Sequence, residues 1–364
     1  MGQHKLYLLR GTPGESRKIP LASALLAGLA LALVLLAGPA RPAMGQTGRP
    51  DDRLTAWIAY WDLPRGMAEW RAHPGLFDTV RVFAASFNDK DQPYLAPEWE
   101  ALFHGDVGHA FGRTPAFLTV VNDLTPPSGK NAKLKDPALV RRLVSTPAAR
   151  AAHGDALIAL AKRSRFAGLE IDYENIAADD WPAFLDFIRE LYQRTSQQGL
   201  ALSVLLQPQG RYLGQPLPVG PQYLLMGYNL YGSHSGPGPK ATPAFLADQA
   251  SALRAIGALS ATGLALSTGG FDWTEGKSAV QLDETAAATL VARKKVPSTR
   301  SAPDGYLISQ YRDAEGKSHE IWHADAQTLS TLWQAARDAG FSRLAIWRLG
   351  GNAPGLFDWL QSLK

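Results

Sequence analysis

Short apolar segments recur along the chain at intervals that leave room for a helix between one segment and the next. Eight of them have the length of a strand and are rich in Val, Ile, Leu and aromatic residues. They are Thr55–Tyr60, Val80–Ala85, Ala116–Val121, Gly168–Tyr173, Ala201–Leu206, Tyr223–Tyr228, Leu264–Ser267 and Arg343–Trp347. Eight strands that alternate with helices are the count of a (β/α)8 TIM barrel, so the pattern predicts this α/β fold.

Several segments between the strands carry apolar residues at spacings of three and four, which is typical of amphipathic helices. Helices are predicted, for example, at 137–164, 181–198, 243–256 and 326–339. Residues from about 275 to 322 differ, because a helix-like stretch, "DETAAATLVARKK", is followed by the alternating segments "GYLISQYRD" and "SHEIWHAD" around a "DAEG" turn. This interval predicts a small α+β insertion with a β-hairpin before the last helix and strand.

The first 45 residues differ in kind from the rest. A polar, basic start leads into an apolar run of 18 residues, 21–38. This run is long for a signal peptide and short for a membrane span, so a signal peptide cleaved after Gly45 and an N-terminal membrane anchor are both open. Both interpretations predict export, to the periplasm or the medium, with or without attachment to the inner membrane. No linker divides residues 46–364, which we expect to form one barrel domain.

Charge and composition narrow the function further. Residues 1–45 contain five of the 37 Lys and Arg and one of the 33 Asp and Glu, so 32 of each sign remain and the net charge falls from +4 to zero. The remainder has no basic surplus for nucleic acid. The absence of cysteine excludes disulfides and thiol catalysis. His319 and His323 fall in a predicted strand, roughly 13 Å apart, so we expect no metal site, and we expect no cofactor.

The segment "FAGLEIDYENI" places Glu170, Asp172 and Glu174 at alternate positions among large apolar residues. Because side chains alternate faces along a strand, the three acids share one face. Helical segments on both sides predict a covered parallel strand whose acidic face looks into the barrel; the alternative is a polar row that faces water. Neighbouring carboxyls inside a barrel are expected to share a proton, which makes a Glu at the C-terminal end of the strand a candidate general acid.

These motifs resemble glycoside hydrolase family 18, the chitinase-like barrels, whose fourth strand carries D-G-x-D-x-D-x-E. Gly168, Asp172 and Glu174 match this motif, while Ala167 and Glu170 stand in place of its first two Asp residues. The segment "YLLMGYNLYG" is similar to the family's sixth strand, and "LAIWRLGG" is similar to its last. With "YRDAEGKSHEIWHADA", the resemblance points to the bacterial branch that includes spore-cortex and peptidoglycan hydrolases, and it spans residues 55–360.

The resemblance implies a retaining mechanism in which the substrate's own acetamide oxygen attacks the anomeric carbon. Glu174 would be the general acid and base, Asp172 would orient the acetamide, and Tyr228 would donate a hydrogen bond to it. Glu170 would partner Asp172 and share its proton. Asn229, where the family has Asp, would keep a hydrogen-bonding group in support.

Other residues are predicted to contact the sugar. The resemblance implies that Trp347 forms the apolar floor beneath it. Four further candidates follow predicted strands at the end where a barrel displays its active site, and their aromatic faces suit sugar rings as their amides suit hydroxyls. These candidates are Trp61, Asn122, Gln207 and Trp273.

The leading prediction is an exported glycosidase that cleaves β-linked N-acetylhexosamine glycans, either peptidoglycan or chitin-type. Its expected partner is an N-acetylated polysaccharide or oligosaccharide, and a monomer is expected. Two alternatives stay open: a non-catalytic chitinase-like carbohydrate-binding protein, and a cell-envelope scaffold that uses the barrel only as a surface. The presence of both Glu174 and Asp172 favours catalysis, whereas Ala167, Glu170 and Asn229 keep the alternatives open.

Overall fold

The computed structural model describes residues 53–104, 106–126, 132–208, 210 and 214–364, which belong to a compact unit, Gln46–Lys364. The predicted signal peptide or anchor at 1–45, with its apolar run 21–38, lies outside the described residues. In the part of the chain that is described, no helix is long and apolar enough to span a membrane.

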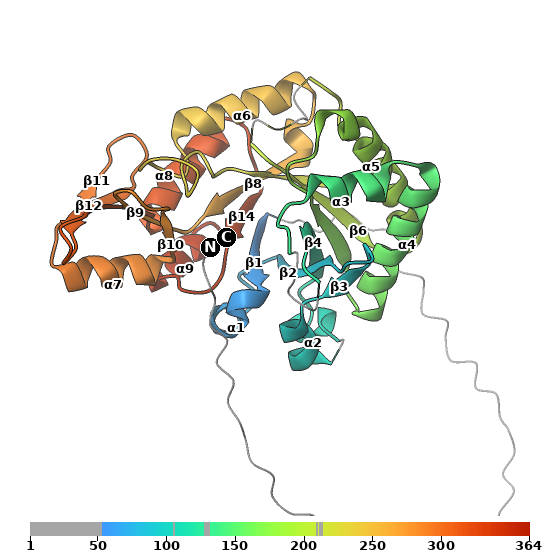
Figure 1. The fold of residues 1–364 in the computed structure, drawn as a ribbon, viewed down its shortest axis with the longest axis horizontal. Coiled ribbons are helices and arrows are strands. Elements are labelled where there is room, and N and C mark those ends of the chain that lie inside the picture. The colour runs from blue at the N-terminus through green and yellow to red at the C-terminus, as the bar shows by residue number, and fades with distance from the viewer. Residues whose placement is uncertain (1–52, 105, 127–131, 209, 211–213) are drawn as a thin grey trace, which may run out of the picture. The chain divides into compact units, whose positions relative to one another are not determined.

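Eight parallel strands close into a barrel, and each coincides with one of the predicted apolar segments (Figure 1). They are β1 (Leu54–Ala59), β2 (Thr79–Phe87), β4 (Ala116–Leu124), β5 (Gly168–Asp172), β6 (Ala201–Leu206), β7 (Gln222–Met226), β8 (Thr262–Ser267) and β14 (Leu344–Trp347). Each pairs with its neighbours in this order, and β14 pairs with β1 to close the ring. A short strand, β3 (Pro93–Leu95), adds to β2 in the antiparallel sense. The predicted TIM barrel is therefore confirmed.

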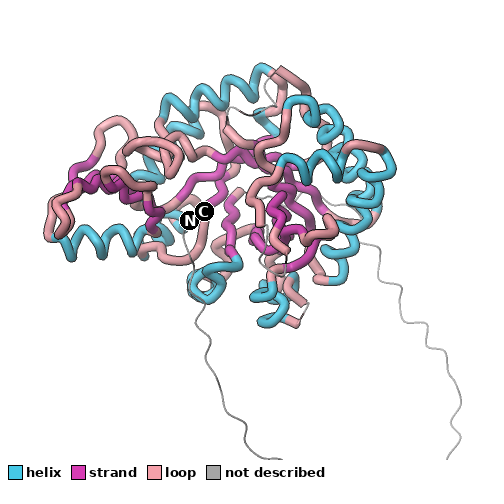
Figure 2. The backbone as a smooth tube through the Cα atoms, viewed as in Figure 1, coloured by secondary structure: helices cyan, strands magenta, loops and turns pink. Residues whose placement is uncertain are grey.

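Helices surround the barrel strands (Figure 2). They are α1 (Leu63–Ala72), α2 (Pro97–Phe103), α3 (Pro137–Val144), α4 (Pro147–Arg163), α5 (Trp181–Gln197), α6 (Pro243–Ala255), α8 (Ala326–Asp338) and α9 (Pro354–Gln361). The prediction of one continuous helix over 137–164 is wrong, because the chain breaks between α3 and α4. Thr146 adopts an extended conformation before Pro147, as the proline ring requires, and its hydroxyl caps α4 by accepting from the Ala149 N–H.

The insertion is a five-stranded antiparallel sheet with one helix (Figure 1). It contains β9 (Gly269–Thr274), β10 (Val280–Leu282), α7 (Glu284–Lys294), β11 (Thr299–Arg300), β12 (Leu307–Arg312) and β13 (Ser318–Ala324). The predicted hairpin is present as β12 and β13. The insertion is wider than the predicted 275–322, because β9 follows β8 almost directly. Gly269 turns the chain there with φ +63°, and its α-hydrogens face the Leu282 carbonyl, where a Cβ would clash.

The two faces of the barrel strands differ as the alternation predicts. Leu169 and Ile171 point outward into the large apolar layer between strands and helices. Inward-facing residues form a smaller buried cluster inside the barrel, which includes Trp57, Phe83 and Tyr228. Strand pairing therefore places the acidic face of β5 opposite aromatic side chains from other strands.

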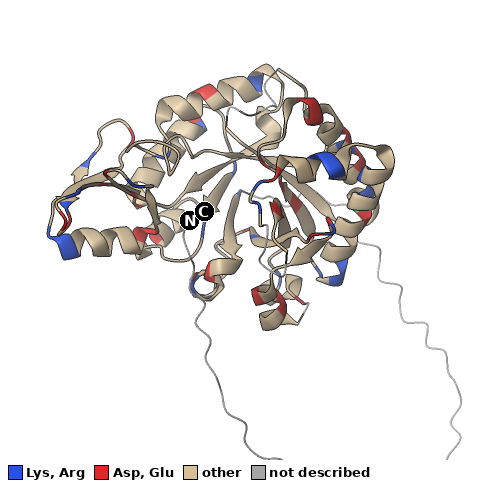
Figure 3. Ribbon diagram, in the orientation of Figure 1, with Lys and Arg blue, Asp and Glu red and all other residues tan. Residues whose placement is uncertain are grey.

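Charged residues of both signs lie on the outer helices (Figure 3). Some pair there, as Arg189 does with Asp186 at 2.5 Å on α5, and such exposed pairs contribute little to stability. The interior of the barrel is different, because Arg81, Glu170 and Asp172 are all buried within it. A buried charge requires a partner, so the contacts of these three side chains indicate how the interior works.

Candidate active site

Glu170 lies at the bottom of the acidic row and is fully enclosed. Arg81 of β2 forms a salt bridge with it. Three further donors reach its carboxylate: the Trp57 indole N–H at 2.8 Å, the Thr119 hydroxyl at 2.8 Å and the Ser203 hydroxyl at 3.1 Å. Strand register sets this arrangement, because Thr119 and Ser203 pair with Glu170 on the two neighbouring strands. The charge is thus neutralised and hydrogen-bonded, as a buried carboxylate must be.

These contacts give Glu170 partners in addition to the predicted one, Asp172. Among the residues that the structure describes, no hydrogen bond joins the two carboxyls, because the oxygens of Glu170 face Arg81 and the three neutral donors. The longer Glu side chain reaches these donors, so its influence on Asp172 is that of a nearby charge. A proton shared between Glu170 and Asp172 stays a prediction.

Asp172 is the second member of the row and is 3% exposed. Its Oδ1 has no hydrogen-bond partner within the described residues, and its Oδ2 lies 3.8 Å from the Lys135 ammonium. Burial raises the pKa of Asp172 to about 7; Lys135 acts in the opposite direction, and the Glu174 and Glu170 carboxylates add to the increase. Asp172 can therefore exchange a proton near neutral pH, a property suited to acid–base chemistry.

Glu174 follows the end of β5 and is the only member of the row whose side chain is substantially open to solvent, at 16%. Its backbone is held by Asn122 of β4, whose amide accepts from the Glu174 N–H and donates to its carbonyl, both at 2.9 Å. Its Oε2 accepts a hydrogen bond of 2.8 Å from the Gln207 amide, and its Oε1 lies 2.6 Å from the Lys135 ammonium. Glu174 is thus held firmly at the C-terminal end of the barrel.

Tyr228, at the end of β7, faces the same carboxylates. Burial, with Asp172, Glu174 and Glu170 nearby, raises the pKa of Tyr228 well above its usual value, so its hydroxyl stays protonated and able to donate. The predicted supporting residue Asn229 is exposed, and it adopts a left-handed conformation with φ +70°. Asn229 lines a cavity.

An aromatic cluster lies over the ends of β1, β2 and β14. Trp347 packs edge-on against Trp57 and Phe83, with ring centroids 5.8 Å and 5.2 Å apart. Trp61 is 50% exposed and lies 6.2 Å from Trp347. These rings offer an apolar surface of the kind that sugar rings pack against. Trp347 and Trp61, both predicted as sugar contacts, are therefore brought together.

Two predicted substrate contacts, Asn122 and Trp273, are engaged by other parts of the protein, and their contact with a sugar stays a prediction. Asn122 is fully buried and its amide is engaged by the backbone of Glu174 and the Asp136 carbonyl, so it positions Glu174. Trp273 lies in the insertion strand β9, is 7% exposed, and donates its indole N–H to the Ser235 carbonyl. Both side chains therefore have packing or positioning roles in this structure.

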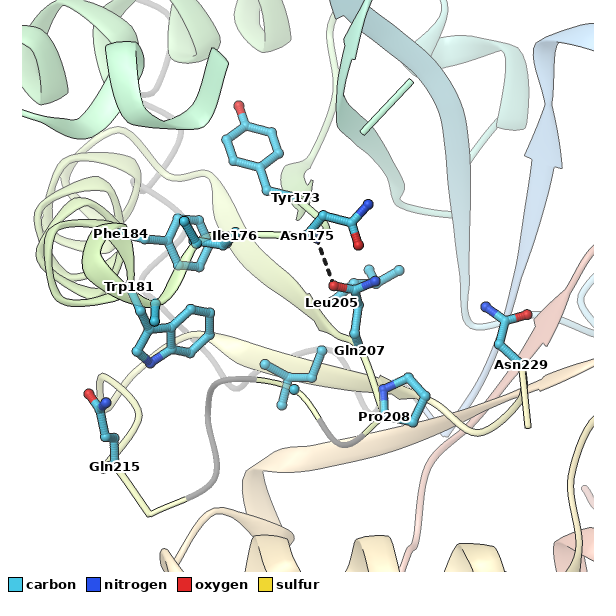
Figure 4. A pocket seen from close by; sticks show the side chains of 14 residues that line it. Tyr173, Asn175, Ile176, Trp181, Phe184, Leu205, Gln207, Pro208, Gln215 and Asn229 are labelled. Carbon is cyan, nitrogen blue, oxygen red and sulfur yellow. Dashed lines mark hydrogen bonds between the residues drawn. The ribbon is translucent and has the colours of Figure 1, made fainter. Parts of the chain in front are cut away.

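Gln207 connects Glu174 to a neighbouring cavity of about 1020 Å³ (Figure 4). Its Oε1 accepts a hydrogen bond of 2.8 Å from the Asn175 N–H, which orients the amide so that its Nε2 faces Glu174. The described residues that line the cavity carry no formal charge, and they include aromatic rings together with the amides of Asn175, Gln207, Gln215 and Asn229. These amides can hydrogen-bond the hydroxyls of a ligand, and the rings offer it an apolar surface.

Sequence reasoning missed two charged residues of this site, Arg81 and Lys135. Arg81 carried a signal, because an arginine inside the apolar strand "VRVFAA" needs a buried anion. Lys135 lies between β4 and α3 in a segment that contains other lysines, so the sequence did not distinguish it. Burial would lower the pKa of Lys135, but Asp172, Glu174 and Asp123 outweigh this and raise it, so the side chain stays cationic. Among the described residues, no group of three or more His, Asp or Glu side chains is arranged to hold a metal ion.

Comparison with known proteins gives relatives of one kind, although no family model matches the chain. A Bacillus subtilis protein named as a sporulation-specific glycosylase, YdhD, is 24% identical over 243 residues, which are 61% of this chain and 56% of that protein. The cortical fragment-lytic enzyme of Bacillus subtilis is 23% identical over 245 residues, 61% of this chain and 53% of the enzyme. The chain thus spans about half the length of these curated relatives.

Solved structures share the fold. The spore cortex-lytic enzyme SleL of Bacillus cereus matches with a TM-score of 0.73 and 17% identity, over 85% of this chain and 73% of that one. A chitinase of Chromobacterium violaceum has a TM-score of 0.71 and 18% identity, over 85% and 98%. A class V chitinase of Nicotiana tobaccum, solved in complex with NAG4, has a TM-score of 0.69 and 16% identity, over 85% and 98%.

Identities this low show a shared fold and leave the chemistry to the site itself. The named relatives and structures are glycosylases, cortex-lytic enzymes and chitinases, which supports the prediction of a glycosidase. Together, the sequence relatives and the barrel confirm the predicted resemblance to the chitinase-like proteins of glycoside hydrolase family 18, in the branch similar to the bacterial spore-cortex enzymes.

Proposed function

We propose that this protein is a glycoside hydrolase that cleaves β-linked N-acetylhexosamine glycans, of the peptidoglycan or chitin type, with retention of anomeric configuration. One observation carries the proposal. Glu174 stands partly exposed at the C-terminal end of β5, directly above the buried Asp172, with the Tyr228 hydroxyl nearby. This end of a barrel is where active sites lie, and an acid next to a second carboxyl and a phenol donor fits substrate-assisted hydrolysis.

In the proposed mechanism the acetamide oxygen of the bound sugar attacks its own anomeric carbon while Glu174 protonates the leaving glycosidic oxygen. Asp172 accepts a hydrogen bond from the acetamide N–H and stabilises the positive charge that develops on the ring of the intermediate. Tyr228 donates to the acetamide oxygen and holds it in line. Glu174, now ionised, removes a proton from the water that opens the intermediate, which returns the enzyme to its starting state.

The surroundings of each residue support these roles. The pKa of Asp172, raised to about 7 mainly by burial, lets this group exist with or without a proton at neutral pH. The partly exposed faces of Trp347 and Trp61 provide a surface for the sugar ring. The cavity beside Gln207, of about 1020 Å³, has room for further sugar rings.

Hydrolysis by the purified full-length chain tests the proposal. It should release reducing ends from peptidoglycan glycan strands or from chitin oligomers, and the first product should keep the β configuration by NMR. Glu174→Gln should lower the rate about 10²- to 10⁴-fold, the typical contribution of a general acid, while glycan binding is retained. Glu100→Gln, a change at an exposed glutamate of α2, is the matched control. Inversion of configuration, or full activity of Glu174→Gln, would contradict the mechanism.

A second candidate function is carbohydrate binding without catalysis. It is favoured by one observation: both carboxylate oxygens of Glu174 are occupied by nitrogen donors, from Lys135 and Gln207. Glycan binding by the wild-type protein without turnover would support it.

We also propose that residues 1–45 direct export, as a cleaved signal or as an anchor through 21–38. Cell fractionation of the full-length chain and of a form that lacks residues 1–45 tests this. Identical distributions of the two forms would contradict it.

A further inference from the structure

Lys135 reaches the site from a backbone position that the end of β4 fixes. Its N–H donates to Asp123 Oδ1 at 2.8 Å, and the next N–H, of Asp136, donates to the Asn122 carbonyl at 2.9 Å. Asp136 in turn caps the N-terminus of α3. The residues that hold Lys135 thus neighbour the one that holds Glu174, since Asn122 also bonds the Glu174 backbone. The contacts of the backbone therefore place the Lys135 ammonium next to the Glu174 carboxylate.

The ion pair between Lys135 and Glu174 conflicts with the role of Glu174 as a general acid. Glu174 must carry a proton on an oxygen that faces the leaving group. In the structure its Oε1 is 2.6 Å from the Lys135 ammonium and its Oε2 accepts from the Gln207 amide at 2.8 Å. Each oxygen of Glu174 thus has one nitrogen donor in contact, and the cationic donor is the one that a proton on Oε1 would have to displace. Gln207 can remain during catalysis, but Lys135 has to release Glu174 first.

The position of Lys135 limits what can release it. Three carboxylates, Asp123, Asp172 and Glu174, act on its single positive charge. Its ammonium also lies 5.7 Å from the centre of the Phe83 ring, which packs against Trp347. Lys135 therefore stands between the aromatic surface and the acid, where a bound sugar would meet it. A neutral sugar that separates the ammonium from Glu174 removes its shortest ionic contact and supplies no anion of its own, so Lys135 keeps only Asp172, at 3.8 Å, and Asp123.

We propose that Lys135 selects glycans with a carboxylate on the sugar next to the cleaved bond, and that this carboxylate takes the ammonium from Glu174. Glu174 then takes up one proton from solvent. The substrate carboxylate replaces Glu174 beside Lys135, and the protonated Glu174 can act as the general acid. The lactyl ether of a muramic acid ring is such a group, since it is attached to the oxygen adjacent to the glycosidic one. This inference rests on the proposed function, because it requires Glu174 to be the acid.

The test compares substrates that differ only in this charge. They are peptide-free oligomers of alternating N-acetylglucosamine and N-acetylmuramic acid, the same oligomers with the lactyl carboxylates converted to amides, and chitin oligomers with the same number of rings. Values of kcat/KM are measured for wild type, Lys135→Met and Lys135→Arg. Lys133→Met is the matched control, because Lys133 is exposed on the same segment, two residues away.

Wild type should prefer the acidic oligomer over its amidated form by about 10- to 100-fold, the value of one charge-assisted hydrogen bond. Lys135→Met should lose this preference, Lys135→Arg should keep part of it, and Lys133→Met should keep all of it. A preference that survives in Lys135→Met would overturn the inference, as would equal cleavage of acidic and amidated oligomers by wild type.

Calorimetry separates this inference from the proposed function. Binding measured in buffers of different ionisation enthalpy should show uptake of about one proton with the acidic oligomer and none with the amidated one, since linkage counts the protons bound. Uptake that depends on Lys135 but is not followed by cleavage would uphold the role of Lys135 and overturn hydrolysis. Cleavage without such uptake or preference would uphold hydrolysis and overturn the role of Lys135.

Discussion

Two pairs of a cation and a carboxylate lie along the acidic face of β5 and its extension. The deep pair is Arg81 with Glu170, whose side chains are 1% and 0% exposed. The upper pair is Lys135 with Glu174, whose side chains are 25% and 16% exposed. The deep pair joins two strands of the barrel, whereas the upper pair joins a strand end to a connecting segment. The two ion pairs are therefore of the same kind, but the lower one is fully buried and the upper one is partly open to solvent.

This difference shows how a single strand can carry one ion pair that stabilises the fold and another that can open when a ligand binds. Arginine presents several donors in a fixed plane, and Glu170 receives three further donors from three other strands of the barrel, so the deep pair is held in place. Lysine is a point charge on a flexible stem, and apart from Lys135 the described residues give the Glu174 carboxylate one side-chain donor, Gln207. The upper pair can thus separate when a ligand arrives, while the deep pair cannot.

Breaking the deep pair should have the largest effect on stability. Arg81→Met leaves Glu170 as a buried charge without its cation, which should lower the free energy of unfolding by about 3 to 5 kcal/mol. Urea unfolding followed by circular dichroism measures this. The double variant Arg81→Met with Glu170→Leu removes both charges and should regain most of the loss. If the free energy of unfolding of Arg81→Met were within about 1 kcal/mol of the wild-type value, Glu170 would not depend on Arg81 for its stability.

Asn122 connects the two depths, because it lies in the barrel and fixes the backbone of Glu174. Asn122→Ala leaves the buried N–H and carbonyl of Glu174 without partners, which should cost about 2 to 3 kcal/mol of stability. It should also lower kcat, since Glu174 loses its position. Asn122→Asp still accepts from the N–H but cannot donate, so it should lie between wild type and Ala. If Asn122→Ala and Asn122→Asp had equal stability and activity, the contacts that Asn122 makes with the Glu174 backbone would not position the acid.

Asp172 lies between the two pairs, and its proton should make stability depend on pH. Its folded pKa of about 7 lies above the unfolded value, so the folded state keeps a proton that the unfolded state has lost. Stability from this group is complete below about pH 4 and is lost as the pH rises to 7. Asp172→Asn lacks this loss, so its stability relative to wild type should increase by about 1 to 2 kcal/mol over that range, because neighbouring carboxylates titrate with it.

Unfolding at pH 4, 5.5 and 7 tests this pH dependence. Asp248→Asn, at an exposed aspartate of α6, is the control and should show no trend. A flat difference between Asp172→Asn and wild type would mean that Asp172 is ionised throughout this range.

The sequence predicted the barrel and the acidic row because both depend on local pattern. Each parallel strand is a short apolar run, and alternation along "GLEIDYE" places its acids on one face. The continuous helix at 137–164 failed on a local rule that was available, since Pro147 excludes a helical conformation at Thr146.

The contacts within the site could not be read in the same way, because they join residues that are distant in sequence. Glu170 is 89 residues from Arg81, and Glu174 is 52 residues from Asn122. The motif therefore singled out the acids of the predicted site, but it could not indicate that Glu170 pairs with Arg81 or that Asn122 bonds the Glu174 backbone. Lys135 resembles Lys133 in sequence, and the fold alone brings one of them to Glu174.

Removal of the upper cation should have the smallest effect on stability, which sharpens the contrast with Arg81. Lys135→Met should change the free energy of unfolding by about 1 kcal/mol or less, because Glu174 keeps its Gln207 donor and Asp172 can take up a proton to relieve repulsion. Urea unfolding of Lys135→Met and Arg81→Met at pH 7, under the same conditions, compares the two losses of stability. A loss as large as that of Arg81→Met would mean that Lys135 is a structural cation, and the accessible pair would then be as fixed as the enclosed one.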